Sequence, residues 1–342
     1  MSYLRKSARC VIQCFMLFGV LCCLALTALP AAAASHAYVA NFGDNSVSVI
    51  DTNTNAVVGS PISVGDSPLY LAVTRNGKFV YVTNVFAPSE SVIDTATNTV
   101  VATVPLGTAG ISLANGVAIT PNGKFAYVAT DSPDGVSVID TATNTVVTTV
   151  PLVPGSAPMG LAITPDGESV YVANNGNGTA TVIDTGTNTV VKTISVGSMP
   201  EDVAITPEGE FAYVTNNGST TVSVIDTETN MVVKTITVGS SPDGVAFTRG
   251  GDFAYVCNLN SNSVSVIDTE TYMVTTITLP VGSLPDSVAF TANGKFAYVT
   301  NENFPGSVWV IDTKTKIIVG TITVGVRPQP SGIAISRRRR ED

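Results

Sequence analysis

Histidine is almost absent from this chain of 342 residues, and the single copy, His36, lies near the N-terminus. A Ser-His-Asp triad, a histidine-bound zinc ion and a haem with a histidine axial ligand all require this side chain. Tryptophan is equally rare, and the one copy, Trp309, argues against a quinoprotein ring built on repeated tryptophans. We therefore expect no catalytic residues of these types in the body of the protein.

Cysteine and charge are scarce as well. Four of the five cysteines lie in the first 34 residues, so the remaining chain has only Cys257 and cannot form an internal disulfide. We expect Cys257 to be a buried, inert thiol. Charged residues make up only 13% of the chain. Loss of Arg5, Lys6 and Arg9 would change the net charge from −9 to about −12, by removal of three positive charges. Such a negative net charge argues against nucleic acid as a partner.

The first 34 residues differ in composition from the rest. Three basic residues precede an apolar run at 11–29, and alanines follow at 31–34, which is the pattern of an export signal cleaved near Ala34. An uncleaved anchor stays open, because the apolar run approaches the ~20 residues that span a bilayer. We predict a signal peptide or signal anchor at 1–34, one domain at 35–336 and a charged tail at 337–342. The protein is then periplasmic, secreted or at the cell surface, without membrane insertion after cleavage.

A repeat covers nearly all of the chain after this segment. The triplet Ile-Asp-Thr occurs seven times, at successive spacings of 43, 46, 44, 42, 42 and 44 residues. A period of about 40–50 residues with several short strand-like runs indicates a β-propeller with one blade per repeat. The clearest copy has four such runs, which we name A (203–206), B (211–216), C (221–227) and D (231–238). We predict an all-β fold, a seven-bladed β-propeller of four-stranded blades.

The two ends of the repeat array complement each other. The array opens with B, C and D runs at 37–41, 46–52 and 57–64, and no A run precedes them. The missing A run lies at 330–336. We predict that this C-terminal strand becomes the innermost strand beside the three N-terminal strands and so closes the ring. The protein is expected to be a monomer.

The B runs carry a family resemblance. They read HAYVAN, FVYVTN, FAYVAT, SVYVAN, FAYVTN, FAYVCN and FAYVTN, and most are followed by a run similar to SVSVIDT. Over residues 36–336 this pattern resembles the YVTN-repeat β-propeller family of archaeal surface-layer and exported bacterial proteins. The resemblance implies the fold but no single activity, because related propellers include lactonases, an amine dehydrogenase subunit and a haem-bearing nitrite reductase domain. The chain departs from the pattern at Thr130, at Cys257 and in a longer D-to-A connection at 107–115.

The repeats disagree most just after each D-to-A turn, on the face where the channel of a propeller opens. The compared triplets are Asp66-Ser-Pro68, Ala114-Asn-Gly116, Pro158-Met-Gly160, Pro200-Glu-Asp202, Pro242-Asp-Gly244, Pro285-Asp-Ser287 and Pro330-Ser-Gly332. Three consecutive repeats place acidic residues at this mouth, namely Glu201, Asp202, Asp243 and Asp286. We name Asn115 and Arg327 as further ligand-binding candidates on the same face. Converging carboxylates suit a cationic or polyhydroxyl ligand.

The same four carboxylates are the candidate ligands of a metal ion. Carboxylate oxygens are the donors that Ca²⁺ prefers, so we predict no cofactor but keep Ca²⁺ open. The alternative is an acidic rim that only contacts solvent and that Arg327 partly neutralises. The other arc of the face is apolar and forms a candidate partner surface of Phe86, Ile111, Leu113 and Met159. Packing among the loops explains these apolar residues equally well.

These observations favour a binding protein over an enzyme. The first hypothesis is an exported, non-enzymatic propeller that binds a protein or glycan partner at the cell envelope through its loop-rich face. The alternative is a Ca²⁺-dependent, lactonase-like hydrolase with Glu201, Asp202, Asp243 and Asn115 around the metal ion. A third possibility is an accessory subunit of an exported redox enzyme.

Overall fold

The computed structural model describes residues 35–336, with gaps at 108–112, 304 and 326–328. The predicted segment at 1–34, the tail at 337–342, Ile111 and Arg327 lie outside the described residues, and the expectations about them stay predictions. The described residues form one compact unit. None of the helices in the described ranges is long and apolar enough to cross a membrane.

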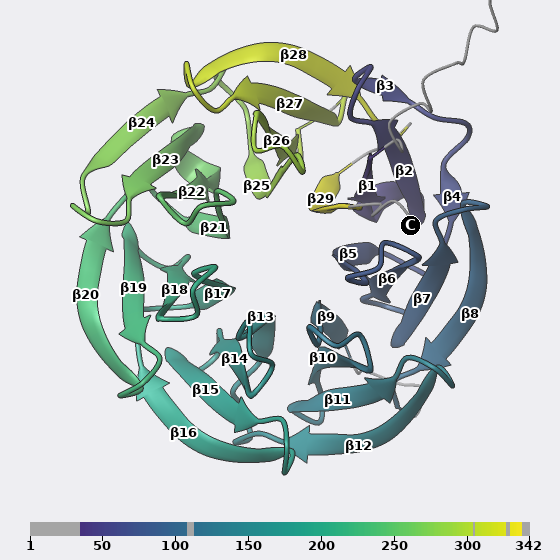
Figure 1. Ribbon diagram of the computed structural model, residues 1–342, viewed down its shortest axis with the longest axis vertical. Helices are drawn as coiled ribbons and strands as arrows, with labels where there is room; N and C mark the ends of the chain where they lie inside the picture. Colours follow the sequence, from purple (N-terminus) through teal and green to yellow (C-terminus); the bar gives the residue numbers. More distant parts are fainter. Residues whose placement is uncertain (1–34, 108–112, 304, 326–328, 337–342) are drawn as a thin grey trace, which may run out of the picture. The chain divides into compact units, whose positions relative to one another are not determined.

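Seven antiparallel sheets surround a common axis, as Figure 1 shows. The innermost, or A, strands are β5 (Pro68–Val73), β9 (Leu113–Ile119), β13 (Pro158–Ile163), β17 (Pro200–Ile205), β21 (Pro242–Phe247), β25 (Pro285–Phe290) and β29 (Pro330–Ile335). The B strands are β1 (His36–Asn41), β6 (Phe79–Asn84), β10 (Phe125–Asp131), β14 (Ser169–Asn174), β18 (Phe211–Asn216), β22 (Phe253–Asn258) and β26 (Phe296–Asn301). Neighbouring A strands contact one another around the whole ring.

The C and D strands complete each blade toward the outside. The C strands are β2 (Ser46–Asp51), β7 (Ser89–Asp94), β11 (Gly135–Asp140), β15 (Thr179–Asp184), β19 (Thr221–Asp226), β23 (Ser263–Asp268) and β27 (Ser307–Asp312). The D strands are β3 (Ala56–Val57) with β4 (Ile62–Ser63), β8 (Thr99–Pro105), β12 (Thr145–Pro151), β16 (Thr189–Ser195), β20 (Met231–Thr237), β24 (Val274–Thr278) and β28 (Ile317–Thr323). The short 3₁₀ helices are η1 (Phe42–Asp44) and η2 (Leu259–Ser261).

This arrangement confirms the predicted seven-bladed β-propeller and its closure. β29 pairs with β1 in the sheet order β29-β1-β2-β3, and β4 also pairs with β2. The D strand of this blade is split into β3 and β4, since Gly59 and Pro61 interrupt it. His36 begins β1, and its backbone N–H donates to Ser336 Oγ at 3.1 Å. His36 is therefore part of the first B strand and is tied to the closing strand.

Most of the hydrophobic core lies between neighbouring blades. One cluster joins Tyr171 and Val182 to Val203 and Val214 of the next blade. Each buried side chain of this size contributes about 1.5–3 kcal/mol relative to an exposed one. The tyrosines of the B strands also bond to the next blade, and Tyr127 donates to Asn188 Oδ1 at 2.7 Å. The ring is thus held by contacts that each blade makes with its two neighbours.

The motif asparagines join two strands of their blade. Asn216 is buried, and its Nδ2 donates to Thr221 Oγ1 at 3.0 Å and to Ser223 Oγ at 3.1 Å. These bonds join strands B and C. The repeated aspartates form the C-to-D turns, where for example Asp226 Oδ1 accepts the Thr229 backbone N–H at 2.8 Å.

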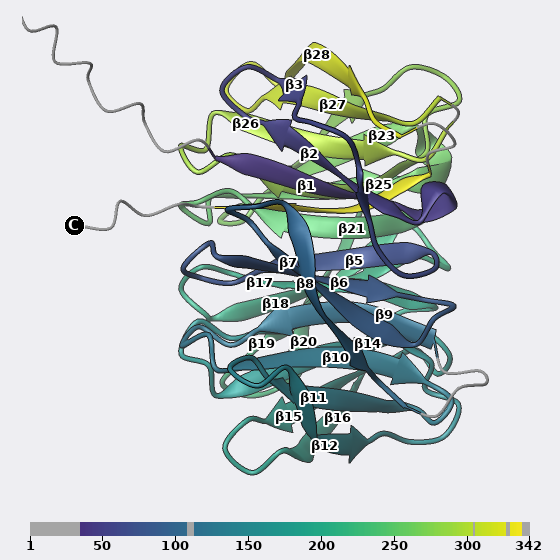
Figure 2. The same cartoon turned by 90° about the vertical axis from the view of Figure 1, so that its right-hand side faces the viewer.

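The strands run between two opposite faces of the ring (Figure 2). One face carries the B-to-C and D-to-A connections, and we call it the mouth face. The other face carries the A-to-B and C-to-D turns. The predicted A run in the clearest repeat is too short, because β17 begins at Pro200 rather than at 203. Glu201 and Asp202 therefore belong to the innermost strand and not to a loop.

Candidate functional site

Each A strand begins with an irregular pairing. In β17, Pro200 pairs with Asn216 and Val203 pairs with Val214, so Glu201 and Asp202 lie in a β-bulge between two regular pairs. A bulge changes the direction of the side chains on its strand. All seven A strands have the same irregularity. The second and third residues of the motif are therefore equivalent from blade to blade.

We name these two positions the rim layer and the axial layer. In chain order the rim layer consists of Leu69, Asn115, Met159, Glu201, Asp243, Asp286 and Ser331. The axial layer consists of Tyr70, Gly116, Gly160, Asp202, Gly244, Ser287 and Gly332. The register of the first repeat differs from the predicted one, because Pro68 and not Asp66 occupies the first position, opposite Asn84. The comparison that begins at Asp66 is wrong by two residues and for this reason overlooks Tyr70.

The structure gathers the four predicted acidic residues on one arc of the channel and adds Glu302. Glu201 Oε2 accepts a hydrogen bond from Asn175 Nδ2 at 3.0 Å, and Asp243 Oδ2 accepts one from Asn217 Nδ2 at 3.2 Å. Both asparagines directly follow the motif asparagine of the preceding blade. Glu302 takes the equivalent place in its own repeat and hydrogen-bonds to Asp286. A comparison of the residue that follows the motif asparagine in each repeat could have identified Glu302 from the sequence.

Burial and mutual repulsion raise the pKa values of these carboxyl groups. Burial, followed by the charge of Asp202, raises the pKa of Glu201 to about 7, although the bond from Asn175 opposes the shift. Burial also raises the pKa of Asp202 to about 6. The pKa values of Asp243 and Asp286 lie well above the usual range, first through burial and then through neighbouring acids. All four side chains keep some exposed surface, so they face a channel that solvent can enter.

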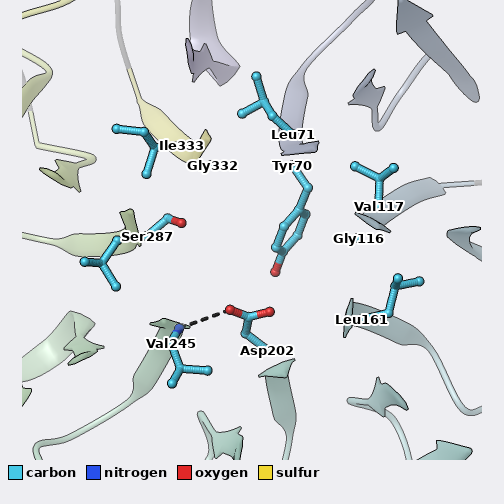
Figure 3. Close-up of a pocket in the computed structure, with 11 residues that line it drawn as sticks. Tyr70, Leu71, Gly116, Val117, Leu161, Asp202, Val245, Ser287, Gly332 and Ile333 are labelled. Atoms are coloured by element: carbon cyan, nitrogen blue, oxygen red, sulfur yellow. Dashed lines mark hydrogen bonds between the residues drawn. The ribbon is translucent and has the colours of Figure 1, made fainter. Parts of the chain in front are cut away.

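Tyr70 lies at the centre of this group. Figure 3 shows its phenol oxygen directed toward the carboxylate of Asp202. Its hydroxyl also hydrogen-bonds to Glu201, which lowers the pKa of that carboxyl. Burial, followed by the charges of Glu201 and Asp202, raises the pKa of Tyr70 well above its usual value. The phenol therefore stays protonated and serves as a hydrogen-bond donor to the acidic group.

Three threonines of the B strands hold the three axial-layer residues that are not glycine. In each pair the residue's backbone N–H donates to the threonine Oγ1, at 3.0 Å for Tyr70–Thr83 and 2.9 Å for both Asp202–Thr215 and Ser287–Thr300. Each hydroxyl also donates to the carbonyl of the same residue at 3.3 Å. Blades with an axial glycine have another residue at the threonine position: Ala40, Ala129, Ala173 and Cys257. This pairing is the sequence signal that could have identified Tyr70.

A cavity of about 160 Å³ lies on the axis and is lined by all seven A strands. Tyr70, Asp202 and Ser287 line it in the axial layer. Asp202 is held in place by its neighbours, since Oδ1 accepts the Val203 N–H at 2.8 Å and Oδ2 accepts the Val245 N–H at 3.0 Å (Figure 3). The cavity therefore has a fixed anionic group in its wall.

The remaining predicted residues are more dispersed. Asn115 is buried, and its Nδ2 donates to the Pro158 carbonyl at 2.8 Å, so it joins two A strands. Phe86 is 61% exposed and contacts Phe42 edge to face, with ring centroids 6.1 Å apart. Leu113 and Met159 are partly buried in their strands. Among the described residues of the candidate partner surface, Phe86 is therefore the one most exposed to solvent.

The carboxylates suit calcium chemically but are not arranged as a metal site. Within the described ranges, no group of three or more histidine, cysteine, aspartate or glutamate residues is placed to hold a metal ion. Cys257 is fully buried, as predicted, and burial raises the pKa of its thiol well above the usual value. Its inert character follows from both observations.

Two β-propeller families match parts of the chain. The YNCE-like β-propeller family matches residues 192–335. The family described as lactonase, 7-bladed β-propeller, matches residues 117–237. The chain is a seven-bladed β-propeller. The two matched segments overlap in the blade that contains Glu201 and Asp202.

Solved structures share this propeller fold. Hydrazine synthase of Kuenenia stuttgartiensis is 26% identical, with a TM-score of 0.70 over 79% of this chain and 90% of that chain. A functionally unknown protein from Desulfotomaculum acetoxidans DSM 771 is 20% identical, with a TM-score of 0.74 over 89% of this chain and 99% of that chain. The dihydro-haem d1 dehydrogenase NirN is 17% identical, with a TM-score of 0.65 over 87% and 74%. No curated protein sequence matches the propeller significantly.

Proposed function

We propose that this chain is an exported, non-enzymatic β-propeller scaffold that binds a protein or glycan partner at the cell envelope through its mouth face. The observation that carries the proposal is the arc of carboxyl groups from Glu201 to Glu302 around the channel. Export rests on the sequence pattern of residues 1–34. Phe86, which is 61% exposed on another arc of the same face, provides an apolar contact in addition to the acidic arc.

The acidic arc defines the chemistry of the partner. Ionised carboxylates attract cations and accept hydrogen bonds from hydroxyl and amino groups. Asn175 and Asn217 already hold Glu201 and Asp243 in fixed positions, which lowers the entropic cost of binding. A partner rich in amino or hydroxyl groups therefore fits the mouth better than an anionic one.

Three soluble polysaccharides of different charge test this role. We expect immobilised protein to bind an oligomer of glucosamine most tightly, neutral dextran more weakly and polygalacturonate least. The double variant Asp243→Asn/Asp286→Asn should weaken binding of the glucosamine oligomer by about tenfold or more, because charge-assisted hydrogen bonds are lost. Biolayer interferometry at low and physiological salt measures both effects.

A matched control removes two charges from the opposite face. Glu208→Gln/Asp252→Asn changes two exposed residues in A-to-B turns and should leave binding unchanged. Equal losses in the two double variants would show that net charge alone attracts the polysaccharide. Absence of binding to all three polysaccharides would reject the glycan form of the proposal.

The second candidate is a lactonase-like hydrolase. The lactonase match at 117–237 favours it, since this segment contains Glu201 and Asp202. A carboxylate with a pKa of about 7, as in Glu201, is well matched to a general base that activates water. The metal-assisted form has less support, because the described carboxylates are not placed to hold Ca²⁺.

A lactone hydrolysis assay with and without a chelator separates the two candidates. The scaffold proposal predicts no turnover above the uncatalysed rate under either condition. Turnover that the chelator abolishes and that Asp243→Asn removes would establish the Ca²⁺-dependent enzyme instead. Turnover that persists with the chelator but is lost in Glu201→Gln would establish a hydrolase without the metal ion.

A further inference from the structure

Seven positions in the described part of the chain carry asparagine followed by glycine, a pair that is chemically unstable. The backbone nitrogen of the glycine can attack the side-chain amide carbon of the asparagine, because glycine has no side chain to hinder it. The asparagines of these pairs are Asn76, Asn115, Asn122, Asn175, Asn177, Asn217 and Asn293. The fold places them in different surroundings, so we expect them to react at different rates.

Three of the pairs are held in A-to-B turns. Asn76 Oδ1 accepts the Thr74 hydroxyl at 2.8 Å and the Lys78 backbone N–H at 2.9 Å. Asn122 and Asn293 accept the equivalent bonds in their own turns. The glycine N–H of each turn also donates to the carbonyl of the threonine, at 2.7 or 2.8 Å. Attack requires the amide and the glycine nitrogen to move toward each other, so these bonds oppose it.

Three further pairs are held by contacts with a D-to-A connection or an innermost strand. Asn115 is buried, and its amide donates to the Pro158 carbonyl. The amides of Asn175 and Asn217 donate to carboxylates of the rim layer. The glycines that follow these two asparagines donate their N–H groups to carbonyls of the D-to-A connections at 2.9 and 3.0 Å. These pairs should also be protected in the folded protein.

Asn177 differs from the other six asparagines. It lies in the connection between β14 and β15 on the mouth face, with a glycine on each side, and its side chain is exposed. No hydrogen bond joins its Nδ2 to another described residue. The Gly178 N–H donates to the Asn174 carbonyl at 3.2 Å, a longer bond than those of Gly176 and Gly218. Both reacting groups are therefore less restrained here than in the other pairs.

Thr179 supplies a hydrogen-bond donor to the amide of Asn177. Asn174 Nδ2 donates to Thr179 Oγ1 at 2.9 Å, which leaves the hydroxyl proton for another acceptor. Thr179 Oγ1 donates this proton to Asn177 Oδ1 at 2.6 Å. A donor at the amide oxygen stabilises the negative charge that develops there when a nitrogen attacks the amide carbon. The surroundings of Asn177 thus favour the attack as well as permit it.

The fold also requires the glycine of this pair. Gly178 has a φ of 69°, in the left-handed region that favours glycine. A Cβ atom added there would lie 3.0 Å from the Gly197 carbonyl oxygen. The turn therefore keeps the least hindered residue directly after Asn177.

We propose that Asn177 undergoes spontaneous deamidation on the mouth face. The Gly178 nitrogen forms a bond to Cγ of Asn177 while the bond from Cγ to Nδ2 breaks, and the proton of that nitrogen leaves with the departing ammonia. The product is a cyclic succinimide, which water opens to an aspartyl or isoaspartyl residue at position 177. The mouth face gains a carboxylate two residues after Asn175, the hydrogen-bond partner of Glu201. No partner or enzyme takes part, so the inference goes beyond the proposed function and does not depend on it.

Peptide mapping by mass spectrometry, after incubation of the full chain in ¹⁸O-labelled water, tests the proposal. At mildly alkaline pH we expect the folded protein to take up the label first at Asn177, about tenfold faster than at Asn76 or Asn122, since each hydrogen bond that must break slows the reaction. The chain unfolded in urea is the reference, and there the difference should disappear. Uptake at Asn177 as slow as at Asn76, or faster uptake at another pair, would overturn the proposal.

Two variants and a matched control locate the reaction. Asn177→Ser should abolish the acidic species that ion-exchange chromatography separates from the folded protein during incubation. Thr179→Val removes the donor to the amide and should slow deamidation about fivefold, whereas Thr221→Val, at the equivalent position of the next blade, should leave the rate unchanged. Acidic species that form equally in Asn177→Ser would overturn the assigned site. An unchanged or faster rate in Thr179→Val would overturn the role of the hydroxyl.

Discussion

Deletion of residues 328–342 is expected to lower the melting temperature by about 10 °C or more. The deletion removes β29, which pairs with β1 and contacts β5 and β25 on either side. Burial of Ile333 alone is worth about 1.5–3 kcal/mol, and each lost strand hydrogen bond adds about 1 kcal/mol. A total loss of about 5 kcal/mol corresponds to a shift of this size for a domain of a few hundred residues.

The matched control for this deletion removes only residues 337–342. This shorter deletion leaves β29 intact and should keep the melting temperature of the full chain. Circular dichroism and scanning calorimetry measure both variants. An unchanged melting temperature after deletion of 328–342 would show that closure by β29 does not stabilise the ring.

Replacement of Glu90 by valine is expected to stabilise the protein, most strongly at alkaline pH. Glu90 is fully buried, and neither of its side-chain oxygens has a hydrogen-bond partner. The equivalent residues in the other blades are small and apolar: Val47, Val136, Ala180, Val222, Val264 and Val308. An unpartnered buried polar group costs about 1–3 kcal/mol, so Glu90→Val should raise the free energy of unfolding by about 3 kcal/mol at pH 8.

The sign of the pH dependence follows from the pKa of Glu90. Burial raises this pKa well above the value of 4.5 that applies to the unfolded chain. A raised pKa in the folded state means that stability is fully present below pH 4.5 and is lost as the pH rises through the folded-state pKa. The advantage of Glu90→Val should therefore be small at pH 4 and grow toward pH 8. Urea unfolding at several pH values measures it.

Two further variants control this experiment. Glu90→Gln cannot ionise and should remove the pH-dependent part of the difference, while its unpartnered polar atoms keep part of the cost. Val222→Glu places the same carboxyl at the equivalent position of another blade and should destabilise the protein in the same pH range. Destabilisation by Glu90→Val at pH 8 would mean that the carboxyl has a stabilising partner.

The sequence predicts the fold because each repeat carries the same strand and turn residues at equivalent positions. Ile-Asp-Thr ends every C strand with an aspartate turn, and each B strand carries a tyrosine that packs between blades. The closing strand is also predictable, since the first repeat lacks an A run. The first residues of the A strands are harder to predict. The bulge after Pro200 interrupts the alternation of apolar and polar residues by which a strand is recognised.

The site is only partly predictable, for reasons of register and burial. Glu201, Asp202, Asp243 and Asp286 are found because they differ from the other repeats at positions that align easily. Tyr70 is overlooked because the first repeat aligns correctly only when Pro68 is placed opposite Asn84. Glu302 and Glu90 are overlooked because comparison of the D-to-A connections does not include their positions. Which carboxyl groups share a channel depends on the closed ring, and no single repeat contains that information.

The closure of the ring also removes any fixed beginning from the fold. Ser35 Oγ donates to the Ser336 carbonyl at 2.5 Å, so the two ends of the propeller meet on the face opposite the mouth. A short linker between them and a new opening in an exposed A-to-B turn, such as the one at Glu208, would preserve every strand pairing. The propeller is therefore suited to circular permutation and to insertion as a domain within another protein, with the mouth directed away from its host.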